Sequence, residues 1–187
     1  MDKGETSFSD MQTVKRNFFA MRNGVIADTL RRSGSPFRII FGLNLPQISE
    51  IALKSPHSRE MAESLWANKT TRESMLIAPM LVKQEDFTID DARRWIADIP
   101  AEEVADVLCL KLLKHLGYAA SLADELAGSS DRMARYTGLR LKFNLLNIDV
   151  RDALRYAEKA LSSETDKRCI TLAAQLKDEC LWMLEEE

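Results

Sequence analysis

The chain has 187 residues, of which 45% are hydrophobic and 29% charged, so it is long enough to bury a substantial core, and its length favours one domain. Seven glycines and five prolines exclude a collagen-like or linker-dominated chain, and the abundance of Leu, Ala and Met with few aromatic residues favours helices over a sandwich or barrel. A formal net charge of −3 argues against a strongly cationic protein that coats nucleic acid.

The cysteines and the apolar runs indicate where the protein works. Cys109, Cys169 and Cys180 are odd in number and contain no close pair, which argues against a disulfide framework or a zinc ribbon and fits a reducing cytoplasm. No apolar stretch approaches the roughly 20 residues of a membrane span, and the polar start MDKGETSFSD does not resemble a signal peptide. We therefore expect a cytoplasmic protein with no membrane contact, no metal and no cofactor.

Apolar residues at helical spacing predict about ten helices in chain order. The first covers about 10–32 and ends at the breakers of 33–36, and Asn44 with Pro46 predicts the start of a second helix that reaches about Lys54. An apolar run over 75–81 should be kinked or shortened by Pro79. The other predicted helices cover about 57–66, 88–97, 101–116, 121–127, 131–146, 150–161 and 164–184.

An imperfect internal repeat suggests how these helices stack. Four segments begin polar and then become apolar, and corresponding positions in them are held by Arg72, Asp106, Arg135 and Arg168. Their separations of 34, 29 and 33 residues are close to the repeat length of helix-pair solenoids. We predict one all-α domain over 1–187, built from antiparallel helix pairs, with 1–43 as an N-terminal cap. An ordinary helical bundle is the alternative.

Basic residues cluster locally although the whole chain is acidic. Six basic residues and one acid lie between Lys15 and Arg38, and seven basic residues and four acids lie over 131–159, where Arg132 and Lys142 belong. Phosphate binding depends on local potential rather than on total charge. Solvated helix faces are the plain explanation of such clusters, and a basic surface for nucleic acid is the alternative.

In a stacked solenoid, the starts of equivalent helices converge on one surface. The four corresponding positions of the repeat would then form a stripe. In this stripe, Arg side chains and helix N-termini bind phosphate, and Asp106 stays ionised among cations. Glu102 and Asp106 share a helix face, a spacing compatible with an acid/base pair or a metal, but no His completes such a site. Acids that favour the helix dipole explain them equally well.

Several remaining residues have plain structural interpretations. We expect Trp66, Trp95 and Trp182 to pack in the core and Cys109 to be a buried, inert thiol. His115 is expected on the surface at a helix end. No Gly-rich phosphate loop, nucleophile elbow or metalloprotease signature is present in the sequence.

From about Phe18 to Glu179 the sequence resembles the AlkD-type DNA alkylation-repair proteins. The segment FGLNLPQISEIA, which ends at Ala52, is similar to the family's entry into its first repeats, and SLWANKTTRESMLIAPML, which ends at Leu81, is similar to the next repeat. The resemblance implies a right-handed superhelical solenoid of HEAT-like antiparallel helix pairs. It also implies double-stranded DNA, including alkylated DNA, as the partner.

The resemblance also implies site residues, because active members are DNA glycosylases that excise alkylated purines with an Asp, an Arg and aromatic side chains. Asp106 corresponds to the catalytic Asp and Arg135 to the Arg, with Arg72, Arg132, Arg168 and Lys142 as DNA-binding residues. The family's aromatic positions hold Glu102 and Met133 here, and a third falls near Ala173. Aromatic faces favour cationic ligands, which Glu cannot imitate.

The sequence thus supports two function hypotheses. The first is an AlkD-like, DNA-binding helical-repeat protein of the DNA alkylation-repair family, which, if it is an enzyme, cleaves the N-glycosidic bond of alkylated purines. The alternative is a catalytically inactive helical-repeat scaffold that binds a protein or peptide partner. A small-molecule hydrolase has no supporting set of residues in the sequence.

Overall fold

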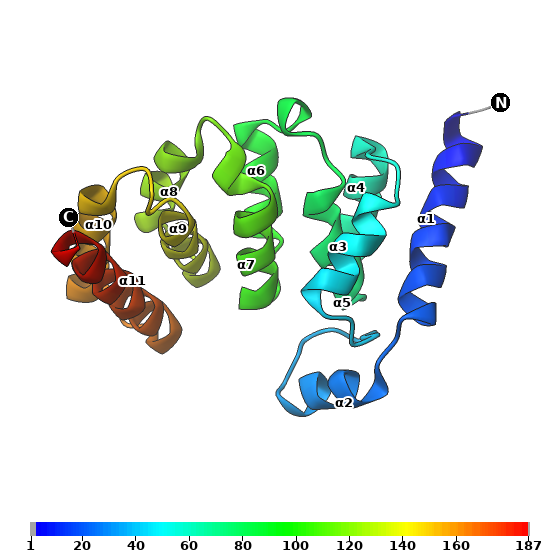
Figure 1. The fold of residues 1–187 in the computed structure, drawn as a ribbon, viewed down its shortest axis with the longest axis horizontal. Helices are drawn as coiled ribbons and strands as arrows, with labels where there is room; N and C mark the ends of the chain where they lie inside the picture. The colour runs from blue at the N-terminus through cyan, green and yellow to red at the C-terminus, as the bar shows by residue number, and fades with distance from the viewer. Residues whose placement is uncertain (1–2, 187) are drawn as a thin grey trace. The chain divides into compact units, whose positions relative to one another are not determined.

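The computed structural model describes residues 3–186, and Figure 1 shows its fold. The chain forms two compact units, with the boundary between Thr88 and Ile89. Eleven α-helices and three short 3-10 helices account for the regular structure of the described residues, and the only strand-like pairing among them is an isolated bridge between Ile39 and Thr71. The predicted all-α class is confirmed. The single domain over 1–187 stays a prediction, and residues 1, 2 and 187 lie outside the described residues.

The first unit contains five α-helices. They are α1 (Lys3–Ala20), α2 (Gly24–Arg32), α3 (Leu45–Leu53), α4 (Arg59–Trp66) and α5 (Arg72–Ile77), followed by the 3-10 helices η1 (Ala78–Met80) and η2 (Gln84–Asp86). Helix α4 packs against α1, α5 and η1, and α3 packs against α5. The predicted shortening at Pro79 is confirmed, because α5 passes into η1 just before this residue.

The prediction of one continuous helix over 10–32 is wrong. The chain leaves α1 after Ala20, and Asn23 has extended backbone angles, with a side chain that accepts hydrogen bonds from the backbone N–H groups of Val25 and Ile26. Asn23 is therefore the N-cap of a new helix. Its own backbone N–H donates to the carbonyl of Phe41 at 2.8 Å, which ties the break to the segment before α3. The apolar periodicity of the sequence continues across the break and conceals it.

A buried carboxylate organises the segment that connects α2 to α3. Glu73 is fully buried and accepts hydrogen bonds from the backbone N–H groups of Phe41, Gly42 and Leu43 at 3.1, 3.0 and 3.3 Å. Gly42 has a φ of +80°, and a Cβ atom there would lie 2.2 Å from the carbonyl oxygen of Asn23. Only glycine fits this close approach. The segment then ends at Asn44, which forms a capping box with Gln47 and starts α3.

The second unit contains the remaining helices. They are α6 (Ile89–Ala97), α7 (Glu102–Lys111), η3 (Leu113–His115), α8 (Ala119–Ala127), α9 (Arg132–Asn144), α10 (Val150–Ser163) and α11 (Lys167–Glu185). The predicted helix over 101–116 is shorter than expected, because it ends at Lys111 and continues as η3. Helices α9, α10 and α11 each begin after an aspartate, Asp131, Asp149 and Asp166, whose side chain accepts backbone N–H groups of the first turn.

Helix pairs α8–α9 and α10–α11 pack within themselves, and α9 also contacts both α7 and α11. Helices α7, α9 and α11 therefore lie side by side in this unit (Figure 1). Helix α9 lies close to α10 and α8 at Gly138, where a Cβ atom would lie 2.5 Å from the hydroxyl of Tyr156 and 3.0 Å from Cβ of Leu126. The small residue lets α9 approach both neighbouring helices.

The core predictions hold at three of four positions. Trp66, Trp95 and Cys109 are buried, as expected. The prediction that Trp182 packs in the core is wrong, because this residue is 54% exposed. The buried residues of α11 follow one helical face that ends at Cys180, and Trp182 falls two residues beyond it, on another side. Within the described residues, no helix has the length and apolar character needed to span a membrane.

Candidate functional site

The first turns of α7, α9 and α11 meet at Glu102. Its carboxylate Oε1 lies 2.7 Å from Nη1 of Arg132 and 3.4 Å from Nε of Arg168. Burial acts to raise the pKa of Glu102, but the hydrogen bond from Arg132 and the charges of both arginines lower it overall. Arg168 is 73% exposed and Arg132 is partly exposed. Thus Glu102 holds two guanidinium groups together while leaving both accessible from solvent.

One turn further along α7, Asp106 is held by two side chains of α9. Its Oδ1 accepts a hydrogen bond from the hydroxyl of Tyr136 at 3.0 Å and another from Nε of Arg140 at 2.7 Å. Among the described residues no hydrogen bond reaches Oδ2, and the side chain is 39% exposed. The carboxylate is therefore fixed through one oxygen and open through the other.

Arg140 is enclosed by aromatic rings as well as paired with Asp106. Its guanidinium lies 5.9 Å from the ring centroid of Tyr136 and 5.7 Å from that of Phe143. Burial raises the pKa of Tyr136 to about 12, so the phenol stays protonated and can donate to Asp106. Burial also raises the pKa of Asp106 above its ordinary value, even though the charge of Arg140 opposes this shift.

Arg135, the other predicted catalytic residue, contacts a different carboxylate. Its Nε and Nη2 donate to the two oxygens of Glu164 at 2.7 and 3.1 Å, and its Nη1 donates to the backbone carbonyls of Ser129 and Ser130. The hydrogen bond from Arg135 holds the pKa of Glu164 far below its ordinary value, at about 2. All three nitrogens of this guanidinium are thus used inside the protein, and among the described residues no hydrogen bond or ion pair joins Arg135 to Asp106.

Two further predicted DNA-binding residues are buried in the structure. Lys142 places its ammonium between Asp124 and Asp152, where it pairs with both carboxylates. Arg72 lies in the first unit and donates to the carbonyl of Leu43 and to Glu73. Of the predicted residues, the structure brings together Arg132 and Arg168 next to the helix turn that carries Asp106, and it places Arg135, Lys142 and Arg72 elsewhere.

The positions where the family resemblance expects aromatic side chains are filled in other ways. Glu102 binds two arginines, and Met133 and Ala173 are buried among the helices. Tyr136 and Arg140 were missed by the sequence reasoning. Their signal was present, because they lie 30 and 34 residues from Asp106, within the spacing of the repeats, and four residues apart on one helix face.

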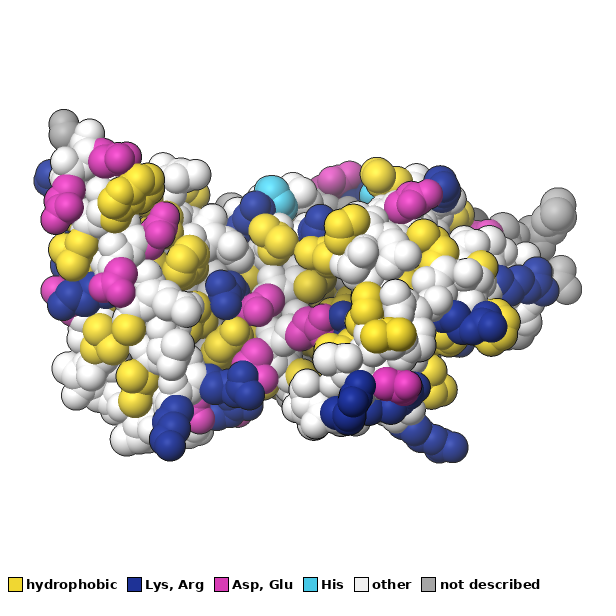
Figure 2. All heavy atoms as spheres, turned by 60° about the horizontal axis from the view of Figure 1, so that its bottom comes forward, with side chains coloured by type: hydrophobic (Ala, Val, Ile, Leu, Met, Phe, Trp, Pro, Cys, Tyr) yellow, Lys and Arg dark blue, Asp and Glu magenta, His cyan; other side chains and the backbone are white. Residues whose placement is uncertain are grey.

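Two guanidinium groups beside the carboxylates of Glu102 and Asp106 can bind an anion. Because Asp131 and Asp166 already cap the starts of α9 and α11, the positive charge for a phosphate comes from Arg132 and Arg168 and not from the helix ends. Figure 2 shows basic and acidic side chains interleaved on the face turned forward. No group of three or more potential metal ligands is present in the described part of the chain.

Comparisons with known proteins bear on the family and the fold of the chain. The family model described as DNA alkylation repair enzyme matches residues 14–168. A solved structure described as "a new family of proteins related to the HEAT-like repeat DNA glycosylases with affinity for branched DNA structures" is similar, with a TM-score of 0.76 and 19% sequence identity, over 89% of this chain and 73% of that chain. No curated protein sequence matches. The predicted HEAT-like helical-repeat fold is confirmed by the structural likeness.

Proposed function

Because the chain belongs to the DNA alkylation repair enzyme family, we propose that it is a DNA-binding protein that contacts the phosphate backbone through Arg132 and Arg168. The observation that supports this most strongly is that these two guanidinium groups meet at Glu102, with Arg168 exposed and Arg132 partly exposed. Glu102 itself lies one helix turn before Asp106 on α7. A cytoplasmic location, expected from the cysteines, is part of the same proposal.

Excision of an alkylated purine is the second candidate, and the open Oδ2 of Asp106 favours it. In such a reaction the bond between the sugar and a cationic base breaks, and the electron pair leaves with the base. A carboxylate stabilises the positive charge that develops on the sugar, and a water molecule then adds to the sugar carbon and releases a proton. Tyr136 and Arg140 would position Asp106 for this role. The charge of Arg140 at 2.7 Å works against it, because it already offsets part of the negative charge. DNA binding is therefore our main conclusion and glycosylase activity the subordinate one.

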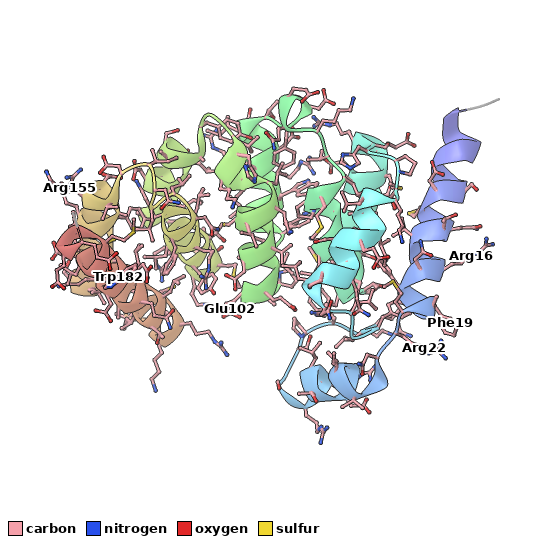
Figure 3. All side chains as sticks on the ribbon, in the orientation of Figure 1. Arg16, Phe19, Arg22, Glu102, Arg155 and Trp182 are labelled. Carbon is pink, nitrogen blue, oxygen red and sulfur yellow. The ribbon has the colours of Figure 1, made fainter. Side chains whose placement is uncertain are left out.

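A salt series with fluorescently labelled duplex DNA tests the binding. For the wild type we expect the logarithm of the binding constant to fall linearly with the logarithm of salt concentration, by about 0.9 for each phosphate contact. The double variant Arg132→Gln/Arg168→Gln should lose about 1.8 from this slope. Arg155→Gln/Lys159→Gln is the matched control, because it removes two charges from α10, where Arg155 lies far from Glu102 in the same unit (Figure 3). Equal losses in both variants would reject the assignment.

The same titration also tests whether the chain binds branched DNA more tightly than linear DNA. The similar solved structure is described as having affinity for branched DNA. We propose that this chain prefers a four-way junction to a linear duplex of the same length, and the ratio of the two binding constants at one salt concentration measures this preference. A ratio near one would limit the proposal to duplex DNA.

Release of a methylated purine from duplex DNA tests the chemistry. If the chain is a glycosylase, Asp106→Asn should reduce the rate at least about 100-fold, and Tyr136→Phe should reduce it less, because Arg140 still holds the carboxylate. Asp178→Asn, an exposed change on α11, is the control. Equal rates for the wild type and Asp106→Asn would remove Asp106 from a catalytic role. Binding that is absent or insensitive to salt would instead favour the scaffold that holds a protein or peptide.

A further inference from the structure

A row of exposed side chains on α1 combines positive charge with an aromatic ring. Gln12, Lys15, Arg16 and Phe19 follow the spacing of one helical face, and Arg22 continues it just past the helix end. We call these five residues the α1 patch. Figure 3 shows Arg16, Phe19 and Arg22 projecting from the same side of the helix, away from the rest of the first unit. No acidic residue occurs in the sequence from Met11 to Ala27.

The aromatic ring of the patch is both exposed and fixed. Phe19 is 58% exposed, whereas its neighbour Phe18 is fully buried. The guanidinium of Arg22 lies 3.9 Å from the ring centroid of Phe19, and its Nη1 donates to the carbonyl of the same residue at 2.9 Å. This contact covers one face of the ring and orients it. The remaining exposure leaves another part of the ring free for a ligand.

The patch borders an open depression of about 500 Å³ that is lined by Gln12, Lys15, Arg16, Phe19 and Phe41. Phe41 is fixed by two contacts. Its backbone N–H donates a hydrogen bond to Glu73, and its ring centroid lies 5.9 Å from that of the buried Phe18. The lining of the depression therefore includes two aromatic and two cationic side chains. The proposed function leaves all five lining residues without a role.

We propose that the α1 patch binds single-stranded DNA, with one unpaired base stacked on Phe19 and the adjoining phosphates on Lys15 and Arg16. A base inside a duplex already stacks on its neighbours, so an exposed ring reaches only an unpaired base. The lysine and arginine supply the positive groove that follows the backbone, and Arg22 adds a cation to the stack. The inference rests on the proposed function for the choice of DNA as the polymer.

Binding of a labelled thymidine 12-mer, measured by fluorescence anisotropy on the full chain, tests the proposal. Phe19→Ala should weaken binding on the order of tenfold. Phe19→Leu, which keeps the apolar surface without the ring, should weaken it similarly. Val25→Ala, another exposed apolar side chain of the same unit, is the control and should leave the affinity unchanged.

The charges are tested through the salt dependence of the same titration. Lys15→Gln/Arg16→Gln should reduce the salt slope by about 1.4, or 0.7 for each phosphate. Lys83→Gln, an exposed lysine of the same unit, should leave it unchanged. As a local signal, the indole introduced by Phe19→Trp should be quenched when the oligonucleotide binds, beyond any quenching of the three native tryptophans.

The outcomes separate this proposal from the proposed function. Loss of 12-mer binding in Phe19→Ala with unchanged duplex binding supports both. Phe19-dependent binding of the 12-mer without any duplex binding would support the α1 patch and reject the role of Arg132 and Arg168. Equal 12-mer binding by the wild type and Phe19→Ala would overturn the patch proposal. Binding of phosphatidylserine vesicles in place of the oligonucleotide would overturn it too.

Discussion

Arg135 and Glu164 form a two-point ion pair that joins α9 to the turn between α10 and α11. Glu164 also accepts the backbone N–H groups of Thr165 and Asp166, both at 2.9 Å. The Glu164 carboxylate thus shapes the turn after α10 and binds the preceding repeat through Arg135. Arg135 therefore contributes to the stability of the second unit whatever its part in DNA binding.

The pair makes stability depend on pH in acid. The pKa of Glu164 is lowered from its ordinary value of 4.5 to about 2. A lowered carboxyl pKa adds stability above pH 4.5 that disappears as the pH falls through about 2. Glu164→Gln should reduce the free energy of unfolding by at most about 3 kcal/mol at pH 7, and its curve should converge with that of the wild type between pH 4.5 and 2. Denaturant titrations over this range measure the difference.

Glu50→Gln is the matched control for that experiment, because Glu50 pairs with Lys54 on an exposed surface of α3. Such surface pairs contribute little stability, so its pH profile should stay parallel to that of the wild type. A constant difference between Glu164→Gln and the wild type from pH 7 to pH 2 would contradict the predicted role of ionisation.

Gly42 and Gly34 allow the cost of backbone strain to be measured separately from the cost of a steric clash. Both have positive φ, but a Cβ atom at Gly42 would meet Asn23 at 2.2 Å, whereas at Gly34 nothing lies within 4 Å. Gly34→Ala should cost about 1 kcal/mol, for the left-handed backbone alone. Gly42→Ala should cost more than about 3 kcal/mol, because the clash adds to the same strain. Equal changes in the thermal unfolding midpoint would contradict this packing.

Phe18 and Phe19 are adjacent and should respond in opposite ways. Phe18 is fully buried, and its ring lies against Phe41. Phe18→Ala should destabilise the first unit by about 3–5 kcal/mol. Phe19→Ala, at an exposed position, should change stability by less than about 0.5 kcal/mol. Chemical denaturation followed by circular dichroism measures both, and a large loss in Phe19→Ala would mean that this ring has a structural role.

The cysteines should resist thiol reagents in the folded protein. Cys109, Cys169 and Cys180 are all buried, and burial raises the pKa of Cys169 to about 12. Because the thiolate is the reactive form, labelling at pH 8 should be slow until denaturant is added, and should then reach three thiols per chain. Ser162→Cys places a thiol on the exposed end of α10 and should react at once. Rapid labelling of the native wild type would show that the helices open frequently.

The repeat spacing in the sequence predicted much of the second unit. The side-chain contacts between neighbouring repeats, such as Arg132 with Glu102, Tyr136 with Asp106 and Arg140 with Asp106, join residues 30 to 34 positions apart. These separations match those between corresponding positions of the repeated segments, which predict helix pairs. Spacing gives the neighbouring helix but not the partner side chain, which depends on which faces meet. For this reason Asp106 was predicted beside Arg135 but is bound by Arg140.

The first unit was harder to predict because the hydrogen bonds that organise it join residues far apart in the sequence. Nothing near Glu73 in the sequence indicates that its carboxylate will be buried and will accept three backbone N–H groups from about 30 residues earlier. The break at Asn23 was concealed for a similar reason, since the backbone N–H of this residue, which caps the start of α2, donates to the carbonyl of Phe41. Local signals such as the Asn44 cap and Pro79 were predicted correctly, because they act on their own backbone.

The side-chain contacts between neighbouring repeats, which join residues 30 to 34 positions apart, also affect the order in which the second unit folds. Apart from Arg168, which reaches Glu102 two hairpins earlier, the ion pairs between helix pairs join immediate neighbours, so contact order within the unit stays low and folding can advance one hairpin at a time. A nascent chain that has emerged as far as Asn144 already contains both members of the Asp106–Arg140 pair. The pair of Arg135 and Glu164 closes only when the next hairpin follows, and α9 is then secured on both sides.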